Sequence, residues 1–208
     1  VGIASDGTQQ LWIRPLDAPE VRALPGTEGA SQPFWSPDGT SIAFTYWAEI
    51  RKILLAGGTV QRVCAIPRGS ASGGTWNGEG TIVFSAGSLS ANLYSVSAAG
   101  GEARLLTDHD ESRGETGHWA AQFLPDGRHI LLEIGSGEEE HAGLHVTSLE
   151  EPVERRRVLP DVGRFRYSEP GHLLAVRDGI LLAQPFDAQR MVTTGEAVPI
   201  ASGVAAWA

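Results

Sequence analysis

Three residue types are nearly missing from this chain of 208 residues, which has one cysteine, one methionine and one lysine. A single cysteine excludes an intrachain disulfide, and Cys64 lies in an apolar stretch that favours a small buried side chain. No window approaches 18 consecutive apolar residues, so we expect no membrane insertion by this segment. Because neither a signal peptide nor an initiator methionine is present, we expect a mature or excised piece of a protein.

Positive charge is also scarce. The chain has 16 Lys and Arg residues against 25 Asp and Glu, which gives a formal net charge of −9. An acidic chain has no general attraction to polyphosphate, so a nucleic-acid partner is disfavoured. The arginine triplet at residues 155–157 follows a run of glutamates, and alternation of side chains along a strand favours a solvated edge there. We expect no cofactor and a monomeric chain.

Turn-forming residues, by contrast, are abundant, with 26 glycines and 12 prolines. Both penalise helix interiors, and a hydrophobic content of 41% argues against disorder. One phrase recurs four times: an aromatic residue, a turn that ends in glycine four positions later, and a strand-like apolar run. The copies span residues 34–39, 75–80, 122–127 and 166–171, and their final glycines are 41, 47 and 44 residues apart. Pro-Asp-Gly, found in two copies, favours a tight turn.

Four short antiparallel strands in each unit of about 40–47 residues are typical of a β-propeller blade. We therefore predict an all-β, five-bladed β-propeller of four-stranded antiparallel blades. Four blades cover residues 31–70, 71–115, 116–163 and 164–202, and the fifth combines residues 1–30 with 203–208. Residues 11–18 match residues 181–188, which assigns the N-terminal region to the second, third and fourth strands of that fifth blade. The C-terminal strand would then close the ring by pairing with the N-terminal blade.

The repeat resembles a known family. Residues 35–39 (Trp-Ser-Pro-Asp-Gly), followed by residues 42–44, are similar to the WD40-like (PD40) repeat of the TolB type. Residues 11–17, 123–129 and 183–187 look more narrowly like the propeller domains attached to bacterial serine/threonine protein kinases. The resemblance covers nearly the whole chain and implies a non-catalytic sensor or interaction module, with an extracytoplasmic location favoured. The kinase motifs themselves are absent from the sequence.

Candidate partner-binding residues lie mainly on one long polar connection, residues 107–119, between a fourth strand and the next first strand. Because propellers usually bind ligands on the face that carries such connections, we select four residues there and add two from elsewhere. They are Arg113, Glu115, His118, Trp119, Trp76 and Arg164. The recurring aromatic residues could instead supply stacking platforms, but buried packing between blades is favoured for them. These aromatic residues are Trp35, Trp76, Phe123 and Tyr167.

We expect no bound metal, although a calcium-loop pattern occurs in the same connection. Asp108, Asp110 and Ser112 alternate as oxygen ligands do in such loops. The glycine falls one position late, at Gly114, and Trp119 occupies the place of the bidentate glutamate. A solvated loop is therefore the favoured interpretation.

A histidine pair is the other weak metal candidate. His141 and His145 lie four positions apart, which places both on one face of a strand. With the glutamates at residues 138–140 they could bind zinc or nickel. The intervening Gly143 and a predicted exposed hairpin favour a chance pairing.

Signatures of hydrolytic enzymes are absent, since the Gly-Ser-Ala-Ser-Gly stretch at residues 69–73 has alanine where a nucleophile elbow has serine. We therefore predict a non-catalytic binding, scaffold or sensor propeller that presents loops and a central channel to a protein or peptide partner. Two alternatives stay open. One is a glycan-acting propeller enzyme with two carboxylates at the channel mouth, and the other is a regulatory propeller excised from a kinase or peptidase.

Overall fold

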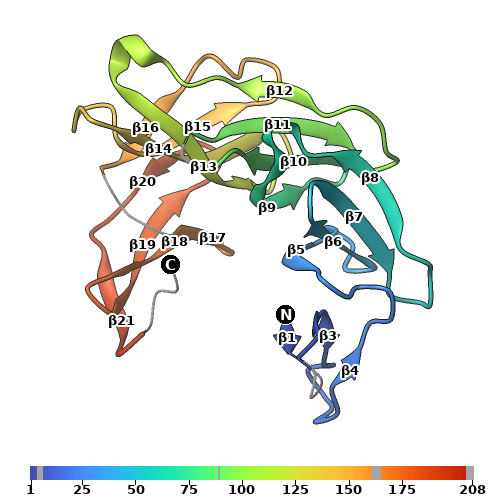
Figure 1. The fold of residues 1–208 in the computed structure, drawn as a ribbon. Helices are drawn as coiled ribbons and strands as arrows, with labels where there is room; N and C mark the ends of the chain where they lie inside the picture. The colour runs from blue at the N-terminus through green and yellow to red at the C-terminus, as the bar shows by residue number, and fades with distance from the viewer. Residues whose placement is uncertain (4–6, 89, 161–164, 205–208) are drawn as a thin grey trace. The chain divides into compact units, whose positions relative to one another are not determined.

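The structure is a computed structural model that describes residues 1–3, 7–88, 90–160 and 165–204 (Figure 1). Regular structure in these ranges consists of strands and two single-turn 3₁₀ helices, η1 (Pro67–Gly69) and η2 (Glu111–Arg113). Within them, no helix has the length and apolar character needed to cross a membrane. The chain divides into two compact units, Val1–Ser88 with Leu93–Leu105, and Leu89–Asn92 with Leu106–Ala208.

The strands follow one another as antiparallel sheets, beginning with two small ones. In these, β1 (Gly2–Ile3) pairs with β2 (Gln9–Gln10), and β3 (Trp12–Ile13) pairs with β4 (Arg22–Ala23). The next sheet is a meander of β5 (Ser31–Trp35), β6 (Ser41–Tyr46), β7 (Glu49–Leu54) and β8 (Gln61–Ala65). The following sheet consists of β9 (Ala71–Trp76), β10 (Thr81–Ala86), β11 (Asn92–Ser97) and β12 (Arg104–Thr107) (Figure 1).

Two larger sheets lie in the second unit. The first comprises β13 (Glu115–Phe123), β14 (His129–Ser136), β15 (Gly143–Ser148) and β16 (Arg156–Leu159), again in chain order. The second begins with β17 (Phe165–Ser168), β18 (His172–Arg177) and β19 (Ile180–Asp187). Here β19 pairs with two short strands, β20 (Val192–Thr193) at its end and β21 (Val198–Ser202) along its first half.

The turns that carry the repeated phrase form as their residue types predict. The Asp38 carboxylate accepts hydrogen bonds from the Ser36 hydroxyl (2.6 Å) and the Thr40 backbone N–H (3.0 Å), and these bonds lower the pKa of Asp38. Gly39 follows with a φ of 68°, a left-handed conformation that glycine adopts without a steric penalty. The turn at Asp126 repeats this arrangement, because its carboxylate accepts backbone hydrogen bonds from residues 128 and 129.

A further regularity appears in the first strand of three sheets. Gln32, Gly73 and Ala120 all have positive φ angles, of 48°, 101° and 52°. Each lies three positions before the aromatic residue of its repeat, at a point where the strand register shifts. An extra residue in one strand is a β-bulge, which redirects a side chain and increases the local twist. The three repeats therefore share a bulge with positive φ at the same position, in addition to their sequence phrase.

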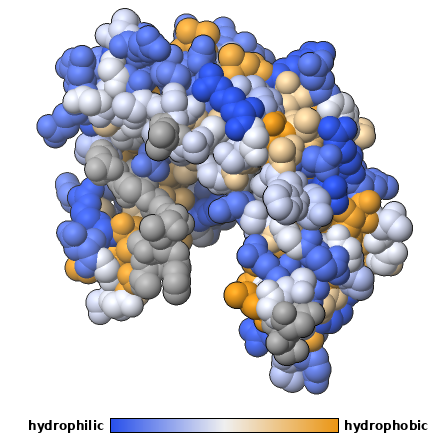
Figure 2. All heavy atoms as spheres, in the orientation of Figure 1, coloured by the Kyte–Doolittle hydropathy of each residue, from blue (hydrophilic) through white to orange (hydrophobic). Residues whose placement is uncertain are grey.

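Apolar residues pack in separate clusters within the units. The first unit has one cluster around Phe84, Ile50 and Val63 and another around Leu24 and Phe44, while the second unit has a cluster around Leu131 and Phe165. Several large apolar side chains near the N-terminus remain exposed, and others lie elsewhere on the surface, where Figure 2 shows scattered apolar atoms. Those near the N-terminus include Ile3 (75% exposed), Leu16 (100%) and Val21 (58%).

The predicted packing of the repeat aromatics is confirmed at three of four positions. Trp76 packs against the cluster of the first unit, Phe123 is 9% exposed, and Tyr167 meets Phe186 edge-on at 6.1 Å. The prediction is wrong for Trp35, which is 52% exposed. Its neighbour Phe34 occupies the buried place instead, with its ring directly against the backbone of β9 at residue 74.

The predicted all-β class is confirmed, and so are four-stranded antiparallel sheets for β5–β8, β9–β12 and β13–β16, whereas the sheet of β17–β21 has five strands. The strands expected after each repeated turn are present as β6, β10, β14 and β18. The N-terminal region contributes short paired strands, as expected for part of a sheet. Of the segment predicted to close the ring, residues 205–208 lie outside the described residues.

Candidate functional site

The polar connection selected from the sequence is held by a buried network at its base. Glu115 and His118, in β13, have side chains that are 1% and 0% exposed. His118 Nε2 lies 3.1 Å from Glu115 Oε2, and His118 Nδ1 lies 2.7 Å from the Thr107 hydroxyl. The Glu115 carboxylate also accepts a hydrogen bond from the Asp110 backbone N–H (2.7 Å). Two of the predicted partner-contact residues are therefore internal groups that fix the connection in place.

Arg155 completes this network from the segment before β16. Its guanidinium lies 3.5 Å from Glu115 Oε2 and donates to the Asp108 carbonyl at 2.9 Å. Only 7% of its side chain is exposed, so the predicted solvated edge is wrong at this position. Among the described residues, Arg155 Nε has no hydrogen-bond partner. No residue near Arg155 in the chain indicates this role, because the partner carboxylate lies 40 positions earlier.

Burial and charge set the protonation of the pair. Burial lowers the pKa of His118 to about 4, against the opposing effect of Glu115 and with a further contribution from the positive charge of Arg155. Burial alone would raise the pKa of Glu115, but hydrogen bonds from Asp110 and His118 outweigh it and the pKa lies below its usual value. At neutral pH the network therefore holds a neutral imidazole between a carboxylate and a guanidinium.

A second polar group adjoins the connection. Asn92 donates to the Asp108 carboxylate (2.7 Å), and its amide oxygen lies 3.0 Å from His109 Nδ1. Ser90 Oγ is nearly equidistant from the two ring nitrogens of His109, at 3.3 and 3.5 Å. A hydroxyl in line with the Nε2 lone pair would lie much farther from Nδ1 than from Nε2. The arrangement lacks the alignment of an activated serine nucleophile.

The structure separates the metal candidates. Asp110 Oδ1 is occupied by the Ser112 N–H (2.9 Å) and hydroxyl (2.6 Å), so it caps η2. In the described part of the chain, the one group of three potential metal ligands is Glu138, Glu140 and His141. His145 is not part of it, because it is buried and its Nδ1 lies 3.1 Å from the Gly143 carbonyl.

The remaining predicted partner-binding residues occupy different places. Arg113 is partly buried and its guanidinium lies 3.2 Å from His141 Nδ1. Trp119 lies over a cross-strand pair of glycines, Gly117 and Gly135, where any added side chain would meet the indole at 2.6 Å. Trp76 packs against the first unit's core. Arg164 lies outside the described residues.

One exposed residue was missed by sequence reasoning. Trp47 begins the two-residue turn between β6 and β7, with a φ of 50° and a side chain that is 81% exposed. Positive φ is a genuine outlier for a bulky residue and favours glycine or asparagine. What distinguishes Trp47 is an exposed indole on a backbone with positive φ, and the sequence alone does not reveal this conformation.

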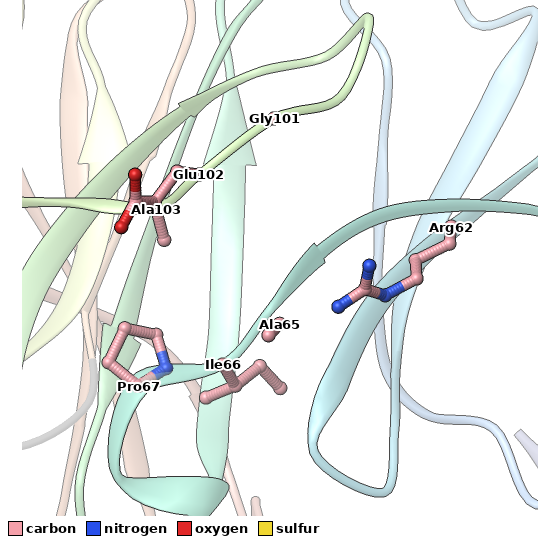
Figure 3. A pocket seen from close by; sticks show the side chains of 7 residues that line it. All are labelled: Arg62, Ala65, Ile66, Pro67, Gly101, Glu102 and Ala103. Atoms are coloured by element: carbon pink, nitrogen blue, oxygen red, sulfur yellow. The ribbon is translucent and has the colours of Figure 1, made fainter.

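A surface cleft of about 430 Å³ lies in the first unit, where the end of β8 faces the start of β12 (Figure 3). Arg62 and Glu102 lie on opposite sides of it, with Ala65 between them (Figure 3). The Arg62 guanidinium is already paired with Glu49 at 2.8 Å. The Gly101 N–H donates to the Val63 carbonyl (3.0 Å), which ties the connection before β12 to β8.

No family model matches the chain. TolB from Acinetobacter baumannii has a similar structure, with a TM-score of 0.69 and 14% identity over 94% of this chain and 49% of that chain. A chain of the nidogen/laminin complex gives a TM-score of 0.64 and 14% identity over 80% and 65%. A prolyl endopeptidase structure gives 0.57 and 19% identity over 85% and 30%. The chain spans less than two thirds of each of these proteins.

These similarities show the fold, which is that of the β-propellers. TolB-type proteins are among its structural neighbours, in agreement with the resemblance of the repeat. Because the neighbours include both a protein complex and an enzyme, the fold by itself does not assign a catalytic or a binding role.

Proposed function

We propose that this chain is a non-catalytic propeller module that binds a protein or peptide partner. The observation that carries the proposal is Trp47, which is 81% exposed in a left-handed conformation. Such a conformation costs about 1–2 kcal/mol for a residue with a side chain. Within the chain, the Trp47 side chain buries little surface that would offset this cost. Tryptophan is one of the residue types enriched at the centres of protein interfaces, where an exposed ring becomes buried.

The surroundings of Trp47 support a rigid contact point. The turn connects β6 and β7, which pair without interruption from Ser41 with Leu54 to Tyr46 with Glu49. The Ala48 carbonyl accepts a hydrogen bond from the Ile66 N–H at 2.8 Å, which ties the turn to the end of β8. A ring on a fixed turn loses little conformational entropy when it binds.

The residues selected from the sequence enter this proposal in two roles. Glu115 and His118 would hold the connection at residues 107–119 from inside, because their side chains are buried. Arg113 and Trp119, which are partly buried, and Trp76 would contribute at the edges of contact surfaces. Arg164 remains a prediction.

We further infer that the complete propeller has five blades closed between the chain ends. Among the described residues β1 pairs only with β2, so one edge of the N-terminal sheet carries no strand. The side chain of Ile3 in β1 is apolar and 75% exposed, which supports a missing neighbour at this edge. A strand from residues 203–208 would supply it. Binding to an attached kinase or peptidase domain would be one form of the proposed function.

Peptide selection tests the function. The immobilised chain is used to select peptides from a random display library, and the Kd of the best peptides is measured by titration calorimetry. We expect Trp47→Gly to weaken binding at least about tenfold, equivalent to about 1.4 kcal/mol. Val153→Ala, which alters another exposed apolar residue (83%), should leave the Kd within about twofold. Equal binding by the wild type and Trp47→Gly would refute the proposal, as would a selection that enriches no peptide.

A further inference from the structure

The hairpin between β14 and β15 presents three potential metal ligands on a well-fixed turn. The Glu138 carbonyl accepts hydrogen bonds from the backbone N–H groups of His141 (3.0 Å) and Ala142 (3.2 Å). The Glu138 N–H donates to the Ser136 hydroxyl (2.9 Å), and the Arg157 guanidinium donates to the Glu139 carbonyl (2.8 Å). These bonds bring Glu138 and His141 to the same side of the turn.

His141 Nε2 lies near one carboxylate oxygen of each of two glutamates. His141 Nε2 lies 3.4 Å from Glu138 Oε2 and 3.6 Å from Glu140 Oε1, and the three atoms all lie within 4.8 Å of one another. Both separations exceed the roughly 2.7–3.2 Å of a normal N–H···O hydrogen bond. Ligand atoms that surround a tetrahedral ion at about 2.0–2.2 Å are separated by about 3.4 Å. We propose that Glu138, Glu140 and His141 bind a divalent transition-metal ion, for which Zn²⁺ is the best fit.

The donor set and its access agree with this choice. One imidazole nitrogen and two carboxylate oxygens suit Zn²⁺ and Co²⁺ better than Ca²⁺, which prefers six to eight oxygen ligands. The glutamates adjoin an open cavity of about 660 Å³ that is also lined by Arg157 and Pro160. An ion can therefore enter from solvent, and a fourth ligand such as water has room to bind.

Arg113 is expected to weaken metal binding at His141, and its replacement tests the direction of this effect. Its guanidinium lies 3.2 Å from His141 Nδ1 and can only donate, so it favours the tautomer with the proton on Nε2. Metal binding at Nε2 requires the other tautomer, in which Nδ1–H needs an acceptor. Arg113→Gln removes both the positive charge and the guanidinium donor that faces Nδ1. We expect this substitution to tighten metal binding by about threefold or more.

The experiment is calorimetric titration of the full chain with Zn²⁺, together with visible absorption of the Co²⁺ complex. The expected result is one saturable site that Glu138→Gln, Glu140→Gln and His141→Gln each weaken at least about tenfold. Four-coordinate binding predicts intense Co²⁺ d–d absorption, which His141→Gln should abolish.

Glu139→Gln is the matched control, because it removes the same charge from the same turn at a residue outside the group of three. It should change the affinity by less than about twofold. The proposal is overturned if no saturable site is found, if Glu139→Gln weakens binding as much as Glu138→Gln, or if His141→Gln has no effect. None of these outcomes depends on the partner-binding role of Trp47.

Discussion

Replacement of Trp47 by glycine should stabilise the fold while removing a functional side chain. Relief of the left-handed conformation gains about 1–2 kcal/mol, and the greater freedom of glycine in the unfolded chain costs about 0.5–1 kcal/mol. Little packing is lost, because the side chain is 81% exposed. The net expectation is an increase of about 0.5–1 kcal/mol in the free energy of unfolding, equivalent to about 1–4 °C in Tm.

Urea and thermal unfolding followed by far-UV circular dichroism measure this change without relying on tryptophan fluorescence. Trp47→Ala is the informative companion, because it removes the indole but retains the Cβ that causes the strain. We expect the glycine variant to be more stable than the alanine variant by about 1 kcal/mol. A loss of more than about 1 kcal/mol in Trp47→Gly would refute the reasoning, since it would show that the indole supports the fold.

Three further predictions concern the buried network and its surroundings. Because the pKa of His118 is lowered in the folded chain, the unfolded chain binds more protons between about pH 6.5 and 4. The free energy of unfolding should therefore fall by about 3 kcal/mol as the pH decreases through this window. In His118→Gln this dependence on pH should be weaker when urea midpoints are compared from about pH 4 to 8. Arg155→Met should lower the free energy of unfolding by about 3–5 kcal/mol at pH 7, because the buried Glu115 carboxylate loses its positive partner. The double variant Arg155→Met with Glu115→Gln should regain part of this loss when both are compared by urea unfolding. Gly135→Ala should lower the free energy of unfolding by about 1–3 kcal/mol through clashes with Trp119 and Thr116. Trp119→Leu should relieve the part that is due to the indole, measured in a double-mutant cycle.

The fold was largely predictable because its signals are local and repeated. Turn chemistry at Asp38 and Asp126 acts within a few residues, and the apolar runs after each turn are short and continuous, as expected for strands buried on both faces. The positive φ angles at Gln32 and Ala120 escaped prediction, since neither residue type announces a bulge. Burial of Phe34 in place of Trp35 depends on which of two adjacent aromatics faces the next sheet, and that choice is made by tertiary packing.

The candidate sites were harder to predict because they depend on contacts between distant parts of the chain. The buried role of Arg155 requires Glu115, which belongs to another strand of the same sheet. The hairpin turn places His141 beside Glu138 and Glu140, whereas the strand spacing that suggested His145 leads into the sheet interior. Polar sequence alone does not distinguish a solvated side chain from one that is buried and paired.

Hydrogen exchange with a selected peptide tests the proposed binding role most directly. Deuterium uptake is measured by mass spectrometry for the full chain, alone and saturated with the best peptide. We predict slower exchange at residues 46–49 and 66–70, the turn of Trp47 and the segment tied to it through Ile66. Protection confined to other segments, with unchanged exchange at residues 46–49, would contradict the assignment of Trp47 as the contact residue.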